Sequence, residues 1–274
     1  MRRLLAIVAR HTVLLVASIL SIYPLLWLLT VALKTQKEYT QNATSLPGSI
    51  DLGNFGAVLG NDVVLRYFLN SVVVVGVAVP IVTVTAVAAG YALARLYGRG
   101  GVFLLFVFLF SEFVPLTIVA IPLLLSVKEM GLEHGIVRLM LVYSVLMMGF
   151  AVLVSRAFFR SIPEELREAA RLDGCGELQV FRRIMVPLAR SPITLIAVIS
   201  FIFLWNEFFL AVVLLESGSD RTLPLGLTEF RGQYQTDWPK IAAALVLSAV
   251  PTLLLYAGFQ GRIANQFSRS TTRE

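Results

Sequence analysis

Six long runs of apolar residues, separated by short polar segments, constrain this chain more than any other feature of its sequence. Charged side chains are almost absent from the runs, although β-branched residues that favour strands in water are frequent. A run of about 20 apolar residues can cross a bilayer as a helix, because every backbone N–H and C=O is then satisfied within the segment. We therefore expect an all-α integral membrane protein with spans near residues 12–33, 70–93, 102–127, 136–158, 193–215 and 241–261.

The composition agrees with a membrane protein and leaves no stretch suited to a soluble domain. Of the 274 residues, 57% are hydrophobic and 15% are charged, whereas soluble domains carry roughly 25% charged residues. The first apolar run is longer than a signal-peptide core, so we expect it to remain attached as a span. We expect residues 1–274 to form a single transmembrane domain.

The distribution of basic residues predicts how the spans are oriented. Of the 23 lysines and arginines, 15 fall in the N-terminal segment, the loops 95–101 and 156–190, and the C-terminal tail. Loops rich in Lys and Arg stay on the cytoplasmic side of a membrane, so both termini are expected there. The membrane thus explains the net charge of +6, and we expect lipid rather than nucleic acid as a partner.

The longest polar segment between two apolar runs, residues 161–187, is expected to form a helix, a turn and a second short helical stretch. Ser161 and Glu164 have the spacing of a capping box, and Pro163 falls in the first turn, where its missing N–H is not needed. Gly174 occupies the position of a left-handed C-cap. We refer to this segment as the 161–187 loop.

Charged side chains in the first helix of the 161–187 loop are spaced to pair along one face. Glu164 with Arg167, and Glu168 with Arg171, are three residues apart, which brings side chains together on a helix. The second stretch is amphipathic and is expected to end before Pro187, because the residue before a proline avoids helical geometry.

The order of residues in this loop resembles the EAA loop of ABC-importer membrane subunits. The sequence Glu168-Ala169-Ala170 is followed by three residues, by Gly174, by nine residues and by Ile184-x-Val186-Pro187. The usual ending is Ile-x-Leu-Pro, so Val186 is a mild departure. In that family the loop is a coupling helix that docks into a groove on a separate ATPase. The resemblance implies the following ATPase-coupling residues: Leu166, Glu168, Ala169, Ala170, Asp173 and Gly174. From the spacing alone, an amphipathic helix resting on the membrane surface is the alternative.

Three polar side chains are expected near the middle of predicted spans. Glu112 lies in the third span, and Asn206 and Glu207 lie in the fifth. An ionised carboxylate in the membrane is costly, so such groups normally face a cavity or a partner. These residues are candidates for the translocation pathway; the alternative is that they hydrogen-bond to neighbouring helices or to a partner subunit.

Further strings extend the resemblance over nearly the whole chain. Trp205-Asn206-Glu207-Phe208 resembles the fifth helix of maltose-type permeases, and the segment ahead of the second span resembles that of sugar permeases. The resemblance implies the six-span type I permease fold in a bacterial inner membrane. It also implies a second permease subunit, a cytoplasmic ATPase dimer and an extracytoplasmic substrate-binding protein. The tail, residues 266–274, lacks the glycine-rich ending of many maltose-type members.

Motifs for catalysis are missing from this sequence. It contains no Gly-x-x-x-x-Gly-Lys-Ser/Thr, so ATP hydrolysis is expected to belong to a partner chain. A single cysteine and two isolated histidines suggest no metal site, and we expect no catalytic residue and no cofactor. Alternatives are an importer of glycerol phosphate esters or amino sugars, a secondary transporter with Glu112 and Glu207 as proton carriers, and a membrane scaffold.

Overall fold

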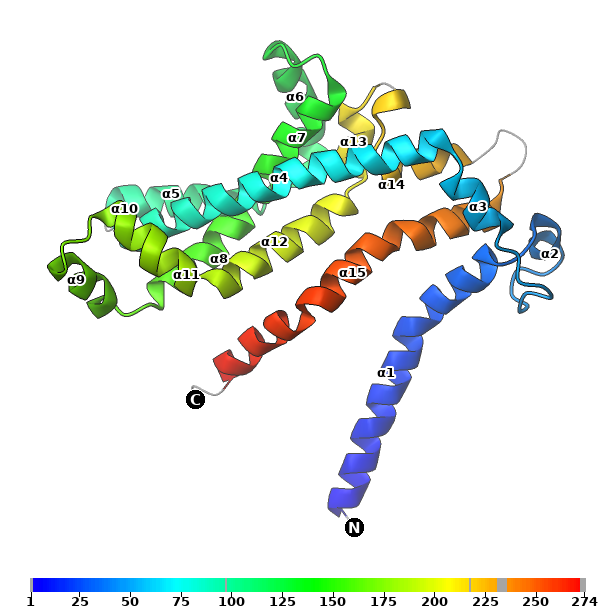
Figure 1. Cartoon of the computed structure of the whole chain (residues 1–274), viewed down its shortest axis with the longest axis horizontal. Coiled ribbons are helices and arrows are strands. Elements are labelled where there is room, and N and C mark those ends of the chain that lie inside the picture. The colour runs from blue at the N-terminus through cyan, green and yellow to red at the C-terminus, as the bar shows by residue number, and fades with distance from the viewer. Residues whose placement is uncertain (1, 97, 217, 231–235, 272–274) are drawn as a thin grey trace. The chain divides into compact units, whose positions relative to one another are not determined.

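The computed structural model describes residues 2–96, 98–216, 218–230 and 236–271, and the elements of these residues are all helices (Figure 1). In chain order they are α1 (Arg2–Ala32), α2 (Gln36–Gln41), α3 (Gly53–Leu59), α4 (Asp62–Arg95), α5 (Arg99–Ser111), α6 (Leu116–Glu129), α7 (Gly135–Leu146), α8 (Met148–Arg160), α9 (Glu165–Leu172), α10 (Glu177–Val180), the π-helix η1 (Phe181–Met185), α11 (Val186–Leu188), α12 (Arg190–Trp205), α13 (Phe209–Leu214), the 3-10 helix η2 (Gly218–Asp220), α14 (Leu223–Gly226), the 3-10 helix η3 (Leu227–Phe230) and α15 (Trp238–Thr271).

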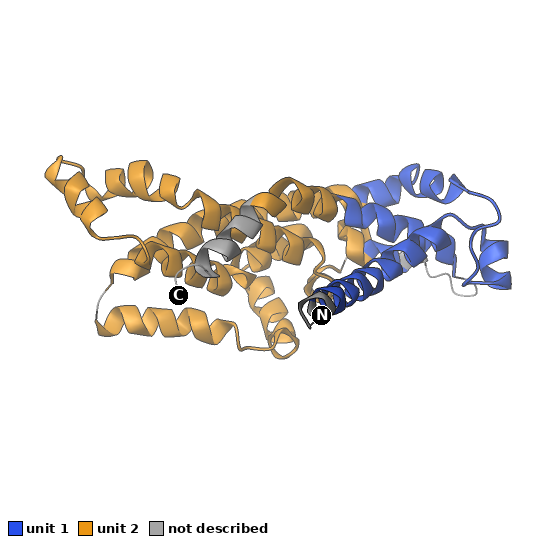
Figure 2. Cartoon of the chain, turned by 90° about the horizontal axis from the view of Figure 1, so that it is seen from below, with its two compact units in different colours: residues 1–66, 226–250 blue, residues 67–225, 251–274 orange. Residues whose placement is uncertain are grey.

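The chain divides into two compact units (Figure 2). Unit 1 comprises Met1–Arg66 and Gly226–Val250, and unit 2 comprises Tyr67–Leu225 and Pro251–Glu274. Unit 2 therefore contains the whole 161–187 loop and all three polar residues predicted within spans. Of the tail predicted to be atypical, residues 266–271 belong to α15 with side chains that are not described, and residues 272–274 lie outside the described residues.

The all-α membrane fold is confirmed, and the number of spans depends on how two bent helix pairs are counted. Among the described residues, four helical segments are long and apolar enough to cross a membrane, or up to six if each bent pair is one span. Helices α5 and α6 meet at an angle of 105° across residues 112–115, within the predicted span 102–127, and Pro115 is the N-cap of α6. The predicted span 193–215 is also not one continuous helix, because α12 ends at Trp205 and α13 begins at Phe209.

In unit 1, side chains satisfy the carbonyl groups at the end of α1. The amide of Asn54 donates to the backbone oxygens of Ala32 at 2.9 Å and Lys34 at 2.8 Å. Lys34 itself is fully buried, and its ammonium group donates to Asn42 O, Ala43 O and Ser45 Oγ. The last carbonyls of a helix lack partners within the helix, so these contacts fix the polar segment that follows the first span.

In unit 2, α8 is central to the packing. It packs against α5, α7 and α12, and α13 packs against α6 and α7. At Gly90 of α4, an added Cβ would lie 2.5 Å from Ser155 Oγ of α8, so a glycine is needed for this close approach. Small residues at such positions let membrane helices pack closely. The result is a bundle from which the 161–187 loop extends.

Candidate functional site

The first helix of the 161–187 loop begins without the predicted capping box. Ser161 still has helical backbone angles, and its hydroxyl donates to Phe158 O at 2.7 Å, within the last turn of α8. Glu164 is the N-cap of α9, and its side chain makes no capping hydrogen bond. The capping-box prediction is wrong because the preceding helix uses the Ser161 hydroxyl.

The end of α9 confirms the predicted left-handed cap. Gly174 has a φ of +83°, which a residue with a Cβ adopts only with strain. Its N–H donates to Arg171 O at 3.0 Å, and the N–H of Cys175 donates to Ala170 O at 3.0 Å. These two bonds form a complete Schellman motif, which satisfies carbonyls that the helix leaves free. The turn therefore has a defined geometry.

The charged pairs of α9 are only partly as predicted. Glu164 and Arg167 form the expected ion pair. Arg171 instead pairs with Glu177, the first residue of α10, with Nη2 and Oε2 2.5 Å apart. Hydrogen bonding by the Tyr91 hydroxyl is the largest cause that holds the pKa of Glu177 below its ordinary value, and Arg171 also lowers it, while burial opposes the shift. Glu177 is thus held as a carboxylate between the two halves of the loop.

The loop exposes apolar side chains beside acidic ones. Leu166 is 46% exposed, Leu172 is 89% exposed and Leu178 is 66% exposed. Glu168, Ala169, Asp173 and Gly174 are exposed as well, whereas Ala170 is buried with 6% exposure. Leu172 was missed because it precedes the C-cap and lies outside the EAA residues. Single exposed leucines are normal on protein surfaces, so it is Leu166, Leu172 and Leu178 together that indicate a binding surface.

The second half of the loop continues past Pro187, contrary to prediction. Helix α10 runs into the π-helix η1 and then α11, which ends at Leu188. Pro187 has no N–H to donate to the carbonyl four residues earlier, and such disturbed hydrogen bonding accompanies π-turns and kinks. Residues 177–188 meet α12 at an angle of 72°. The loop therefore returns to the bundle through a rigid helical bend.

The break between α12 and α13, residues 206–208, is organised by Glu207. Its carboxylate accepts hydrogen bonds from the N–H groups of Leu210 at 2.7 Å and Ala211 at 3.2 Å. These are orphan donors of the first turn of α13, and a negative charge at a helix N-terminus is favourable. The hydroxyl of Tyr143 in α7 donates to Oε2 at 2.6 Å. Glu207, which is 8% exposed, is therefore satisfied by the protein itself.

The other two polar residues predicted in spans lie at helix ends. Asn206 is the exposed C-cap of α12, and its Nδ2 donates to Ile202 O at 2.7 Å. Glu112 is the C-cap of α5, and its Oε1 accepts from the N–H of Phe150 in α8 at 2.7 Å. Glu112 and Glu207 thus each connect two helices, whereas the side chain of Asn206 is exposed.

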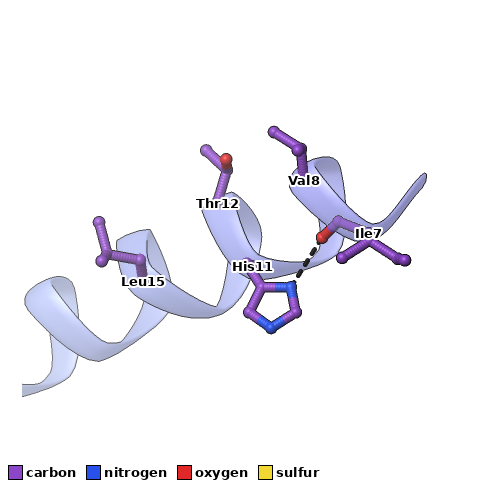
Figure 3. A pocket seen from close by; sticks show the side chains of 5 residues that line it. All are labelled: Ile7, Val8, His11, Thr12 and Leu15. Carbon is purple, nitrogen blue, oxygen red and sulfur yellow. Dashed lines mark hydrogen bonds between the residues drawn. The ribbon is translucent and has the colours of Figure 1, made fainter. Parts of the chain in front are cut away.

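A depression on α1 carries no site. Figure 3 shows the side chains of Ile7, Val8, His11, Thr12 and Leu15, which line it. All five belong to one helix, and His11 Nδ1 lies 2.8 Å from Ile7 O of the same helix. A ligand pocket is a cleft that encloses most of its ligand, which the surface of a single helix does not provide.

The fold of this chain is similar to that of chains in two solved structures. Over 94% of this chain and 96% of the matched one, it superposes with a TM-score of 0.82 and 23% identity on a chain of a bacterial ABC transporter involved in the import of the acidic polysaccharide alginate. The same kind of transporter, bound to an alginate-loaded periplasmic protein, matches with a TM-score of 0.69. This chain therefore shares the fold of these transporter chains.

The sequence then identifies the family. Residues 52–269 match the family of binding-protein-dependent transport system inner membrane components, and the chain belongs to this family. The diacetylchitobiose uptake permease NgcG of Streptomyces coelicolor is 32% identical over 96% of this chain and 88% of that protein. The sulfoquinovosyl glycerol permease SmoH of Agrobacterium fabrum is 31% identical over 89% and 86%. The trehalose permease SugB of Mycobacterium tuberculosis is 29% identical over 89% of both chains.

Family membership settles the class of function. The chain is a multi-pass inner-membrane permease subunit of a binding-protein-dependent ABC transporter, not an enzyme, and ATP hydrolysis belongs to a separate component. This decides against the ion-coupled transporter and the scaffold. It agrees with the resemblance of the sequence to ABC-importer membrane subunits.

Proposed function

We propose that this chain is one of two permease subunits of a carbohydrate importer, paired with a second permease. An extracytoplasmic binding protein delivers the substrate, and two cytoplasmic ATPase subunits drive transport. The substrates named for the relatives support a sugar or sugar derivative, since they include diacetylchitobiose, trehalose and sulfoquinovosyl glycerol. Diacetylchitobiose is built from amino sugars, so the candidate substrates are an amino sugar, a neutral oligosaccharide and a glycerol phosphate ester. We propose residues 1–274 as a single permease domain.

The observation that carries the proposed ATPase contact is the exposed surface of α9. Leu166 and Leu172 present apolar side chains, and Glu168 and Asp173 place negative charge beside them. A central apolar contact rimmed by charge is typical of specific protein interfaces. Ala169 is exposed and small enough to permit close approach. Ala170 is buried in the helix and Gly174 forms its cap, so within the proposed coupling set the role of these two residues is to shape the surface.

The proposed pathway follows the helix breaks. Asn206, exposed at the 206–208 break, can donate to and accept from a hydroxyl-rich substrate. Glu112 and Glu207 also belong to the proposed pathway. Their hydrogen bonds stabilise the two helix breaks, at residues 112–115 and 206–208. Non-helical backbone within a membrane is tolerated where it is buried in protein or lines a cavity, which supports a pore at these positions.

We propose that both termini and the 161–187 loop face the cytoplasm, as the basic residues predict. Cys175, the single cysteine of the chain, lies directly after Gly174 and tests this orientation without mutation. A membrane-impermeant thiol reagent should label it only after the cytoplasmic face is opened. Labelling of Cys175 in intact cells would show that the loop faces the outside, and it would rule out the proposed ATPase contact.

A pull-down in mild detergent tests the importer. The tagged chain should bring down a second permease and a P-loop ATPase, which would be identified by mass. Leu172→Glu should lose the ATPase and keep the second permease, because a charge replaces the most exposed apolar contact of the loop. Leu46→Glu is the matched control, since Leu46 is 80% exposed in unit 1, outside the loop. Recovery of the ATPase with Leu172→Glu at the wild-type level would contradict the proposed surface.

A further inference from the structure

A chain of contacts joins α9 to α4 through one carboxylate. Glu177 Oε2 accepts from Arg171 Nη2 at 2.5 Å and lies 3.6 Å from Arg167 Nη1. Its other oxygen, Oε1, accepts from the hydroxyl of Tyr91 at 2.5 Å. Arg167 and Arg171 are one helical turn apart, so a single face of α9 is held by Glu177. The contacts cross from the 161–187 loop to the end of the second span.

Tyr91 is fixed independently of this contact. The guanidinium of Arg95 lies 3.7 Å from the centre of its ring. The rings of Phe159 and Phe181 lie 5.3 Å and 4.8 Å from it, centre to centre. Aromatic and cation–π contacts of this kind hold a ring in one place. Because Tyr91 is only 7% exposed, its hydroxyl is a rigid point of attachment on α4.

The route is separate from the covalent connections of α9. Along the chain, α9 leads back to α8 through residues 161–164 and forward to α12 through the helical bend at Ala189. Neither connection includes α4. A force that displaces α9 therefore reaches α4 through Glu177 in addition to the contacts of α8 with α4, because the two oxygens of Glu177 are bound on opposite sides, by α9 and by Tyr91.

We propose that Glu177 and Tyr91 are positioning residues that transmit movement of the 161–187 loop to the second span. This inference rests on the proposed function, in which the ATPase contacts α9. When the ATPase moves α9, Arg167 and Arg171 carry Glu177 with them, and Glu177 draws on α4. The second span then changes position together with α8 and α12.

The test uses the complete complex, reconstituted in proteoliposomes with its ATPase and binding protein. Tyr91→Phe removes one oxygen atom and keeps the ring contacts, and Glu177→Gln keeps an acceptor but removes the charge. Both variants should assemble and should hydrolyse ATP. Substrate imported per ATP hydrolysed should fall by between about twofold and about thirtyfold, the range expected for coupling carried by such contacts. A loss of packing alone would lower assembly without changing this ratio.

Control variants and a double variant sharpen the test. Tyr256→Phe on exposed α15 and Glu129→Gln at the end of α6 repeat the two chemical changes away from the network and should leave the ratio unchanged. The variant with both changes should be no worse than the more severe single variant, because both interrupt one route. If Glu177→Gln fails to assemble, Tyr91→Phe alone decides.

The outcomes separate this inference from the proposed function. A wild-type ratio retained by Tyr91→Phe, or single effects that add in the double variant, would overturn the role of the network while leaving the importer intact. If the wild-type complex binds no ATPase, or imports without ATP, the proposed function fails and this inference fails with it.

Discussion

The 161–187 loop and the 206–208 break each contain a glutamate that is hydrogen-bonded to a tyrosine, but the two glutamates have different surroundings. In each, a tyrosine of a neighbouring helix donates to a glutamate, from Tyr91 to Glu177 at 2.5 Å and from Tyr143 to Glu207 at 2.6 Å. The remaining partners differ: Glu177 binds the side chain of Arg171, whereas Glu207 binds backbone N–H groups of α13.

The difference separates a solvent-exposed contact at the loop from a buried one within the bundle. The side chain of Glu177 is 43% exposed and that of Arg171 is 51% exposed, so water screens this ion pair and its contribution to stability is small. Glu207 is 8% exposed, and loss of its bonds would leave donors buried without partners. The first arrangement suits a loop that shifts during a transport cycle, and the second suits a fixed break in a helix.

The largest loss of stability is expected from Glu207→Ala. It removes the acceptor of three buried donors, namely two backbone N–H groups and the Tyr143 hydroxyl. Each donor left without a partner should cost about 1–3 kcal/mol. The melting temperature in detergent should therefore fall strongly, while Glu133→Ala, on an exposed residue, should change it little. Equal melting temperatures for the two variants would mean that the break is not held by Glu207.

Tyr143→Phe should have the second largest effect. It removes one hydrogen bond to a charged group, worth about 1.5–3 kcal/mol, but Glu207 keeps both backbone partners. Its melting temperature should lie between those of wild type and Glu207→Ala. Tyr256→Phe, on a tyrosine that is 51% exposed, is the control. If Tyr143→Phe destabilised as much as Glu207→Ala, the tyrosine rather than the helix cap would dominate the break.

The parts of the loop that were predicted depend on local spacing. Gly174 was placed at the cap because a Schellman motif involves only neighbouring residues, and the Glu164–Arg167 pair is one turn of helix. The six apolar runs were likewise visible, because the length of a span is a local property. The capping box at Ser161 shows the limit of this reasoning, since the hydroxyl had a second acceptor in the preceding helix.

The contacts that distinguish the two regions could not be predicted from spacing. Tyr91 and Glu177 are 86 residues apart, and Tyr143 and Glu207 are 64 residues apart. Their meeting depends on how whole helices pack. Glu207 was recognised as costly in a membrane, but its use as a cap requires the chain to leave the helix at residue 206, and no proline or glycine marks that break.

A smaller effect is expected from Gly174→Ala, which tests the cap of the loop. No atom would meet the new Cβ, so its cost is the positive φ alone, about 1–2 kcal/mol. Gly176→Ala is the matched control, because its φ is −70° and its Cβ would also meet nothing. Gly174→Ala should lower substrate-stimulated ATP hydrolysis relative to Gly176→Ala. Identical behaviour would show that the Schellman turn does not shape the loop.

The smallest effect concerns the charge of Glu177, and it depends on pH. The folded protein lowers the pKa of Glu177, so its ionised contacts stabilise the fold above the ordinary glutamate pKa of about 4.3. That contribution is lost as the pH falls through the lower folded value. The difference in melting temperature between wild type and Glu177→Gln should thus be constant near neutral pH and vanish in strong acid.

Salt completes the contrast between the two regions. Raising the salt from 0.1 M to 1 M shortens the screening length from about 10 Å to about 3 Å, which weakens exposed ion pairs most. The wild-type advantage over Glu177→Gln should shrink, whereas the deficit of Glu207→Ala should persist, because it arises from buried hydrogen bonds. If salt left both differences unchanged, the contribution of Glu177 would not arise from a solvent-exposed ion pair, and the contrast between the two regions would be refuted.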